Sequence, residues 1–266
     1  MLVPSKLTAI RHGESVLNEQ QFRRKQDHDY HRLLESFETD PHSEETQALA
    51  RIVVEKYGHQ IGDHAAPLTQ RGQEQARLTG EALKAESDEL PDVIYLSPYL
   101  RCQETFRYMT LGWPELLDVE DIFNRDNALA ETDYGAVFPY GDWTSFFALH
   151  PDERRRHELA GPYWYRYPNG ENVPDLQQRL SVWYDRMVAN FANRHVMVIA
   201  HYGTILGLRS NIEGWAEDEF IEAFKTAPGA NCGVTEYRAS STTTSERKLL
   251  LQRFAAHLYP DTLLPG

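Results

Sequence analysis

The chain has 266 residues, of which 41% are hydrophobic and 25% are charged, a composition typical of a globular protein that is long enough to bury a sizeable core. Its 40 Asp and Glu residues outnumber its 27 Lys and Arg residues, which gives a formal net charge of −13. This acidic balance argues against nucleic acid or an anionic membrane as the main partner, because both require a basic face.

The cysteine content and the hydropathy pattern indicate the compartment. Cys102 and Cys232 are the two cysteines, too few for a disulfide framework and without metal-ligand spacing, so a reducing compartment is expected. No apolar stretch is long enough to cross a bilayer. Residues 1–6 lack the basic segment and apolar core of a secretory signal. We therefore expect a cytoplasmic protein with no membrane partner.

The first predicted element is a short apolar strand at residues 7–10, which stops at Arg11, His12 and Gly13. Its length suits a strand buried on both faces. Arg11 offers a planar fork of donors that matches a phosphate or carboxylate, and the lone pair of a neutral His12 can attack phosphorus. Gly13 lets the backbone turn close to a ligand. This junction indicates phosphoryl chemistry on histidine; the alternative is a chance triplet with a structural histidine.

A helix or tight loop is predicted to open at residues 14–18, where free amides and the Asn18 side chain could face a phosphate. The alternative for Asn18 is an ordinary turn or cap residue. The polar, charge-rich stretch that follows, residues 19–64, contains apolar side chains at helical spacing over 45–57. We interpret 19–64 as an insertion with one or more helices lying over the body of the protein.

Two helix openings are predicted next. Thr69 is the expected N-cap of one helix. Residues 91–97 predict a strand that feeds a second helix, with Ser97 as its N-cap and Pro98 in its first turn. Arg101 falls in that first turn, where the amides and dipole at the carboxyl end of a strand favour anions. We therefore expect Arg101 to contact a phosphate.

A further short strand is predicted at residues 117–123, and it leads towards Glu131. Glu131 follows an apolar stretch and precedes a turn, so it is a candidate general acid; the alternative is a surface carboxylate. The aromatic-rich stretch 136–171 suits a lid over a cleft. For the three arginines at 154–156 within it, we favour a solvated helix face.

A second junction resembles the one at His12. A strongly amphipathic helix begins at Pro174, and the continuous apolar strand 195–200 then stops at His201. If this strand and the first are neighbours in a parallel sheet, the two histidines must lie side by side.

The C-terminal part predicts two helices and two strands. One helix closes near Gly214, and another spans about 217–225. The final strands are expected at 232–238 and 248–253, joined by a Ser/Thr-rich hairpin turn at 240–245.

In this order, the motifs resemble those of the histidine phosphatase superfamily, in its phosphoglycerate-mutase-like branch, from Leu7 to about Tyr237. The segment Arg11-His12-Gly13-Glu14 matches the defining motif, Ser97 to Thr105 matches the motif whose arginine binds phosphate, and Leu129-Ala130-Glu131 matches the proton-donor segment. The resemblance implies that His12 becomes phosphorylated during turnover and that Glu131 donates the proton. It further implies a second catalytic histidine and a phosphate-binding set, namely His201, Arg11, Asn18 and Arg101.

The resemblance also implies the architecture. We expect an α/β fold with a mostly parallel central sheet flanked by helices on both faces. The chain would form a single domain, residues 1–266, whose insertions at about 19–64 and 136–171 form a lid over the active site. Tyr202 departs from the pattern, since glycine usually follows the second histidine. Its amide could still donate to phosphate, while its side chain reshapes the pocket.

The activity implied is hydrolysis of a small phosphomonoester by a metal-independent phosphatase of the histidine acid type, which needs no cofactor. One alternative is phosphoglycerate-mutase-type phosphoryl transfer, which shares the core residues. Another is a non-catalytic module that binds a phosphorylated ligand, with Tyr202 and the long insertion serving a partner. We favour the phosphatase because the tandem arginine and proline-rich segment of the glycolytic mutases is missing and every reactive position is filled.

Overall fold

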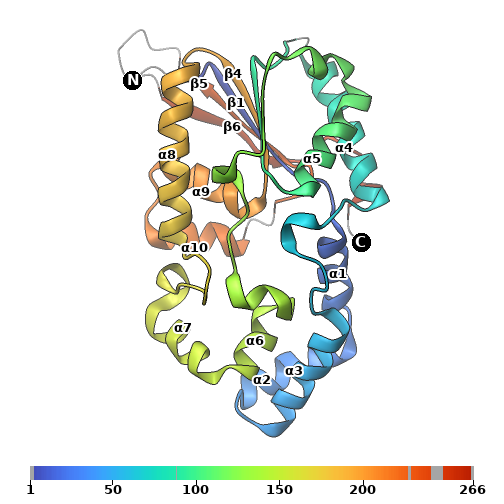
Figure 1. Ribbon diagram of the computed structural model, residues 1–266, viewed down its shortest axis with the longest axis vertical. Coiled ribbons are helices and arrows are strands. Elements are labelled where there is room, and N and C mark those ends of the chain that lie inside the picture. The colour runs from blue at the N-terminus through green and yellow to red at the C-terminus, as the bar shows by residue number, and fades with distance from the viewer. Residues whose placement is uncertain (1–2, 88, 227–228, 241–247, 265–266) are drawn as a thin grey trace.

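The computed structural model describes residues 3–87, 89–226, 229–240 and 248–264. Helices pack on both faces of a central sheet, and a second group of helices lies beyond one end of it (Figure 1). This arrangement is the expected α/β class. Among the described residues, no helix is both long and apolar enough to span a bilayer.

The sheet has six described strands in the order β3-β2-β4-β1-β5-β6. Four of them are parallel, because β1 pairs with β4, β4 with β2, and β2 with β3 in the same direction. Strand β5 is antiparallel to β1, and β6 is antiparallel to β5. The mostly parallel sheet is therefore confirmed. The strands are β1 Lys6–Arg11, β2 Val93–Leu96, β3 Asp121–Asn124, β4 His195–Ala200, β5 Val234–Ala239 and β6 Leu249–Ala256.

The continuous apolar runs explain the central strands. Every residue of β4 is buried, as are all but the last residue of β1, because helices cover both faces of the sheet. Alternate residues of β4 enter different cores: Val196 and Val198 pack on one side, and Met197 and Ile199 on the other. This alternation follows from the two-residue period of a strand.

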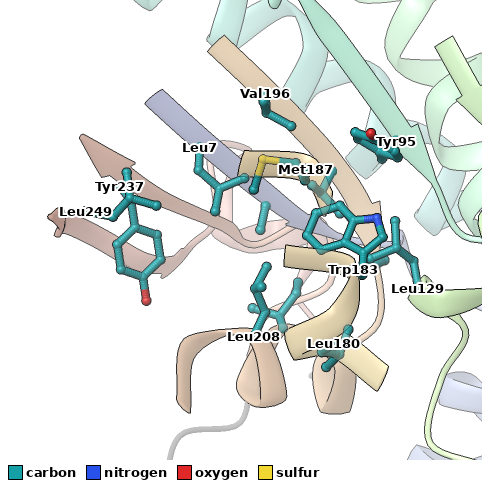
Figure 2. Close-up of a cluster of buried hydrophobic side chains, with 14 of the residues drawn as sticks. Leu7, Tyr95, Leu129, Leu180, Trp183, Met187, Val196, Leu208, Tyr237 and Leu249 are labelled. Atoms are coloured by element: carbon teal, nitrogen blue, oxygen red, sulfur yellow. The ribbon is translucent and has the colours of Figure 1, made fainter. Parts of the chain in front are cut away.

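Four long helices supply the layers beside the sheet. Helices α4 (Gln70–Glu86) and α5 (Leu100–Gly112) cover one face, and α8 (Val173–Phe191) and α9 (Tyr202–Glu213) cover the other. Figure 2 shows Leu180, Trp183 and Met187 of α8 lying against the side chains of β1 and β4. Helix α10 (Glu217–Thr226) packs beside α9.

The α8 interface gives a direct test of the core. Leu180 is fully buried in this cluster, whereas the neighbouring Val182 is 61% exposed. We expect Leu180→Ala to lower the free energy of unfolding by about 2–5 kcal/mol, because it removes buried methyl groups and leaves a cavity. Val182→Ala, the matched control, should change it by less than about 0.5 kcal/mol. Urea denaturation measures both values, and equal stabilities would contradict this packing.

The second group of helices comes from the two stretches that the sequence marks as insertions. Helices α1 (Val16–Lys25), α2 (His28–Thr39) and α3 (Glu44–Tyr57) belong to the first stretch, and α6 (Trp143–Leu149) and α7 (Pro151–Trp164) to the second. Helix α6 packs against both α2 and α3, with Ala148 buried beside Leu33 and Val53. The two insertions therefore form one helical unit, which we call the lid unit.

Several predicted boundaries are wrong. Ser97 does not cap α5, because Tyr99 and not Ser97 occupies the N-cap position. The predicted strand at 117–123 is split between a 3₁₀ helix, Pro114–Asp118, and β3. The strand expected at 232–238 starts at Val234. Of the expected hairpin turn, residues 241–245 lie outside the described residues.

Candidate active site

The register between β1 and β4 brings the two histidines together. Arg11 is paired with Ala200 at the carboxyl ends of these strands, so the next residue of each strand, His12 or His201, leaves the sheet at the same edge. The two imidazole centroids are 5.2 Å apart, and the His12 amide donates to the Ala200 carbonyl at 3.0 Å. The expected juxtaposition of the two histidines is confirmed.

The hydrogen bonds of His12 define its tautomer. Nδ1 lies 2.7 Å from the Gly13 carbonyl oxygen; because a carbonyl only accepts, Nδ1 carries the proton. The lone pair is then on Nε2, which accepts from Arg101 Nε at 3.2 Å. Burial, followed by the charges of Arg101 and Arg11, holds the pKa of His12 well below its usual value. A neutral imidazole with Nε2 unprotonated can act as a nucleophile near neutral pH.

In His201 the opposite ring nitrogen carries the proton. Its Nδ1 accepts from Arg101 Nε at 3.2 Å, so the proton of the neutral ring is on Nε2, which donates to Ser97 Oγ at 2.7 Å. Burial and then the charge of Arg101 lower the pKa of His201 well below its usual value. A phosphate dianion between the two rings would raise that pKa, because an opposite charge favours the imidazolium.

Arg101 lies in the first turn of α5, as the sequence predicts. Its Nε sits between the two imidazoles, and its Nη1 donates both to the Asp63 main-chain oxygen at 2.6 Å and to Asp63 Oδ1 at 2.7 Å. Asp63 begins a short 3₁₀ helix, η1 (Asp63–Ala65), within the predicted insertion. The sequence analysis missed Asp63, because nothing in the polar stretch distinguishes it from other carboxylates.

Glu131 belongs to the same cluster. Its Oε1 accepts from the Thr132 amide at 2.9 Å and faces the start of α9, where a Cβ built on Gly203 would come within 2.6 Å of it. Burial raises the pKa of Glu131, against the opposing effects of the Thr132 amide and of Arg101. The carboxyl group therefore keeps its proton to a higher pH than an exposed glutamate does, as a general acid requires.

The main chain around Glu131 is held by Arg179 of α8. Arg179 Nη1 donates to the Ala128 carbonyl at 2.6 Å, and Nη2 donates to the Ala130 and Glu131 carbonyls at 3.0 and 3.2 Å. Glu171 orients the guanidinium through bonds of 2.7 and 3.0 Å. The sequence analysis missed Arg179. Its position three residues after Leu176, on the apolar face of the helix, could have marked it as a charged residue directed towards the core.

The close approach at Gly203 gives a prediction. A methyl group there would lie 2.6 Å from Glu131 Oε1 and 2.8 Å from Thr132 Oγ1, so the carboxyl group must move while the fold is retained. We expect Gly203→Ala to lower kcat by about 10- to 100-fold, since misplacing a catalytic group by an ångström can cost that much. Steady-state kinetics and a melting curve measure the two effects. An unchanged kcat would show that the position of Glu131 does not matter for the reaction.

Arg11 and Asn18 both lie beside His12. Arg11 Nη1 donates to the Gly229 carbonyl, while its buried Nε has no hydrogen-bond partner among the described residues. Asn18 completes a capping box at the start of α1, where its Oδ1 accepts from the amide and hydroxyl of Ser15 at 3.1 and 3.0 Å. The cap role considered for Asn18 is therefore present, and its phosphate contact stays a prediction.

A further amide near His12 comes from the C-terminal part of the chain. The buried Asn231 donates through Nδ2 to the His12 carbonyl and to Asn18 Oδ1, both at 3.2 Å. The sequence analysis missed Asn231, because it lies more than two hundred residues from His12 and no motif marks it.

The Tyr202 side chain packs towards α10. Its hydroxyl donates to the Ala223 carbonyl at 3.2 Å, and its ring lies 5.9 Å from that of Phe224, with the Arg11 guanidinium 5.8 Å from its centroid. Tyr202 is the first residue of α9, so its main chain stands at a positive helix end. The ring therefore forms a wall beside Arg11, and the predicted amide contact to phosphate stays a prediction.

The loop that carries His12 packs tightly against the start of α4. A Cβ on Gly13 would lie 2.5 Å from the Gly72 oxygen, and a Cβ on Gly72 would lie 2.1 Å from the Glu14 oxygen, so both positions require glycine. The buried Glu14 carboxylate accepts from Thr69 Oγ1 at 2.7 Å and pairs with Arg71 at 2.5 Å. The predicted N-cap, Thr69, is confirmed and also anchors the nucleophile loop.

Comparison with known proteins agrees with this geometry. The family model described as histidine phosphatase superfamily (branch 1) matches residues 49–249, which include Arg101, Glu131 and His201. The chain belongs to the histidine phosphatase superfamily. Within the described residues, no three His, Cys, Asp or Glu side chains come together as a metal-ligand set.

Individual proteins match part of the chain in sequence. A phosphoglycerate mutase-like protein of Arabidopsis thaliana, AT74H, is 25% identical over 173 residues, which cover 54% of this chain and 56% of that protein. The uncharacterized phosphatase PhoE of Bacillus subtilis is 29% identical over 150 residues, covering 56% of this chain and 65% of that one. The matched segments thus span less than two thirds of either relative.

The fold similarity extends further than the sequence similarity. The alpha-ribazole phosphatase of Shigella flexneri superposes with a TM-score of 0.61 at 17% identity, covering 92% of this chain and 95% of that one. At this identity the match concerns the fold.

Proposed function

We propose that the protein is a phosphatase that hydrolyses a small phosphomonoester through a phosphohistidine on His12. In the first step, His12 Nε2 forms a bond to phosphorus while the bond to the ester oxygen breaks, and Glu131 gives its proton to that oxygen. In the second step, water loses a proton to Glu131 and attacks the phosphohistidine. Inorganic phosphate leaves, and Nε2 regains its lone pair.

The surrounding donors would hold the transferred group. We propose that its oxygens are bound by Arg11, Arg101, His201, Asn18 and the Tyr202 amide, with neither metal nor cofactor. Arg101 Nε already lies 3.2 Å from His12 Nε2, so a phosphoryl group on Nε2 would meet this guanidinium. Fixed donors aimed at developing charge are usually the largest catalytic contribution.

One observation carries the proposal. The His12 imidazole donates through Nδ1 to Gly13 and turns Nε2 towards Arg101, so the nucleophile is in the required tautomer before substrate binds. The name of the relative PhoE supports the hydrolase over a binding module. We further propose that residues 1–266 form one cytoplasmic domain of the histidine acid type, with the lid unit covering the site.

The test is to follow ³²P from a labelled monoester. An acid-labile phosphoenzyme together with free phosphate supports the proposal, and binding without release would favour the non-catalytic module. The mutase alternative has its own assay, which uses 3-phosphoglycerate and primer bisphosphoglycerate. Rapid formation of 2-phosphoglycerate would show that phosphoryl transfer, and not hydrolysis, is the main activity.

A further inference from the structure

The lid unit places a carboxylate inside the site, and the mechanism above makes no use of it. Asp63 reaches Arg101 from η1 with both its main-chain oxygen and Oδ1. This contact uses Nη1, whereas Nε of the same guanidinium faces the two histidines. Asp63 and a phosphate on His12 would therefore bind different edges of Arg101, and both can be present at once.

The second oxygen of this carboxylate is available to a ligand. Within the described part of the chain, no group donates a hydrogen bond to Asp63 Oδ2, and the side chain remains 20% exposed while that of Arg101 is 5% exposed. A carboxylate that is anchored through one oxygen, unpaired at the other and partly exposed as a side chain is suited to bind a cation or a hydrogen-bond donor.

Asp63 lies close enough to the proposed proton donor for its charge to act on that residue. Its charge acts on Glu131, the proposed proton donor, and on the phenols of Tyr99 and Tyr134. The Arg101 guanidinium also lies over the Tyr99 ring, with its Cζ 4.8 Å from the ring centroid. Asp63 therefore brings a negative charge beside aromatic rings, surroundings that favour a cation.

Two arginines of the lid unit, Arg24 and Arg154, make contacts within that unit, while Arg24 Nε and Arg154 Nη1 have no hydrogen-bond partner among the described residues. The buried Arg24 donates to the Gly141 carbonyl and lies over the Tyr30 ring, 5.1 Å away. Arg154 is paired with Glu158 at 2.8 Å. A leaving group that bears a carboxylate would be repelled by the Asp63 carboxylate.

We propose that the substrate is the phosphomonoester of an amino alcohol, whose ammonium group is bound by Asp63 Oδ2 while Oδ1 holds Arg101. This inference rests on the phosphatase function proposed above and specifies its substrate class. Asp63 thereby selects substrates by charge, through attraction to an ammonium group and repulsion of a carboxylate.

Three small esters of similar shape test the proposal: O-phosphoethanolamine, ethyl phosphate and 2-phosphoglycolate, whose leaving groups are cationic, neutral and anionic. We expect kcat/KM at neutral pH to be at least about tenfold higher for O-phosphoethanolamine than for 2-phosphoglycolate, with the difference mainly in KM. Added salt should reduce the ratio, because it screens a partly exposed charge.

The variant Asp63→Asn removes the charge but keeps an amide oxygen and the main-chain oxygen near Arg101. We expect it to bring the three kcat/KM values close together; comparing ratios cancels any loss of activity common to all three esters. Glu38→Gln, which removes an exposed carboxylate from α2 of the same lid unit, should leave the ratio unchanged. A wild-type enzyme without charge preference, or an Asp63→Asn enzyme with an unaltered ratio, would overturn the proposal.

p-Nitrophenyl phosphate separates this inference from the function on which it rests. If the wild-type enzyme releases phosphate from this ester through His12 but shows no charge preference among the three, the substrate class is wrong and the phosphatase stands. If no ester yields phosphate or a phosphoenzyme, both proposals fail.

Discussion

Replacing His12 with alanine is expected to lower kcat by at least about 10⁴-fold and to abolish the acid-labile phosphoenzyme, because it removes the nitrogen that bonds to phosphorus. The Cys102 thiol is not expected to take its place. Cys102 lies near His201, with its Sγ 3.6 Å from Nε2, but burial raises the pKa of its thiol to about 12. A neutral, buried thiol is a poor nucleophile.

The control for this variant is ligand binding. His12→Ala retains Arg11, Arg101 and His201, so inorganic phosphate should still bind, as calorimetry would show. Quench-flow with a ³²P-labelled ester measures the covalent intermediate directly. A His12→Ala protein that still turned over or still became labelled would rule out His12 as the attacking group.

The second large effect is expected at the proton donor. Glu131→Gln preserves the shape of the side chain and removes its acid, so kcat for alkyl phosphates should fall by about 10²- to 10⁴-fold. With p-nitrophenyl phosphate, the first step should be much less affected, because the leaving group is stable as an anion. Comparing burst phases for the two esters measures this difference, and equal losses would show that Glu131 does not protonate the leaving oxygen.

The pH profile provides a separate readout of the same residue. Phosphorylation requires Glu131 in its protonated form, and burial raises the pKa of Glu131. The rate should therefore fall as pH rises through that raised pKa, and the fall should disappear in Glu131→Gln. At the acid end the rate of phosphorylation should persist, since the pKa of His12 lies well below its usual value and the ring stays neutral. A wild-type profile without the alkaline decline would contradict this assignment.

The central sheet and the pair of histidines follow from the sequence for a physical reason. Strands buried on both faces appear as continuous apolar runs, and β1 and β4 each stop at a histidine. Parallel neighbours must then present those residues at one edge. Arg101 could be placed because the first turn of a helix after a strand is a known position for anion contacts.

The parts of the site that were missed depend on contacts between distant segments. Ser97 looks like a helix cap from its sequence position, yet its hydroxyl accepts from His201, more than a hundred residues away. Asp63 is one carboxylate among many in a polar insertion, and only the packing of η1 against α5 brings it to Arg101. Local patterns carry no information on such pairings, because they follow from the folded arrangement of the lid unit.

The segment at residues 229–233 gives the nucleophile its main-chain support. The Cys232 amide and the Asn231 side chain both donate to the His12 carbonyl, at 3.1 and 3.2 Å, and the Gly229 carbonyl accepts from Arg11. All of the residues expected to take part in the reaction nevertheless precede this segment. A shortened protein that ended after α9 would retain every motif but lose the antiparallel partner of β1, so a minimal working fragment has to extend through β5.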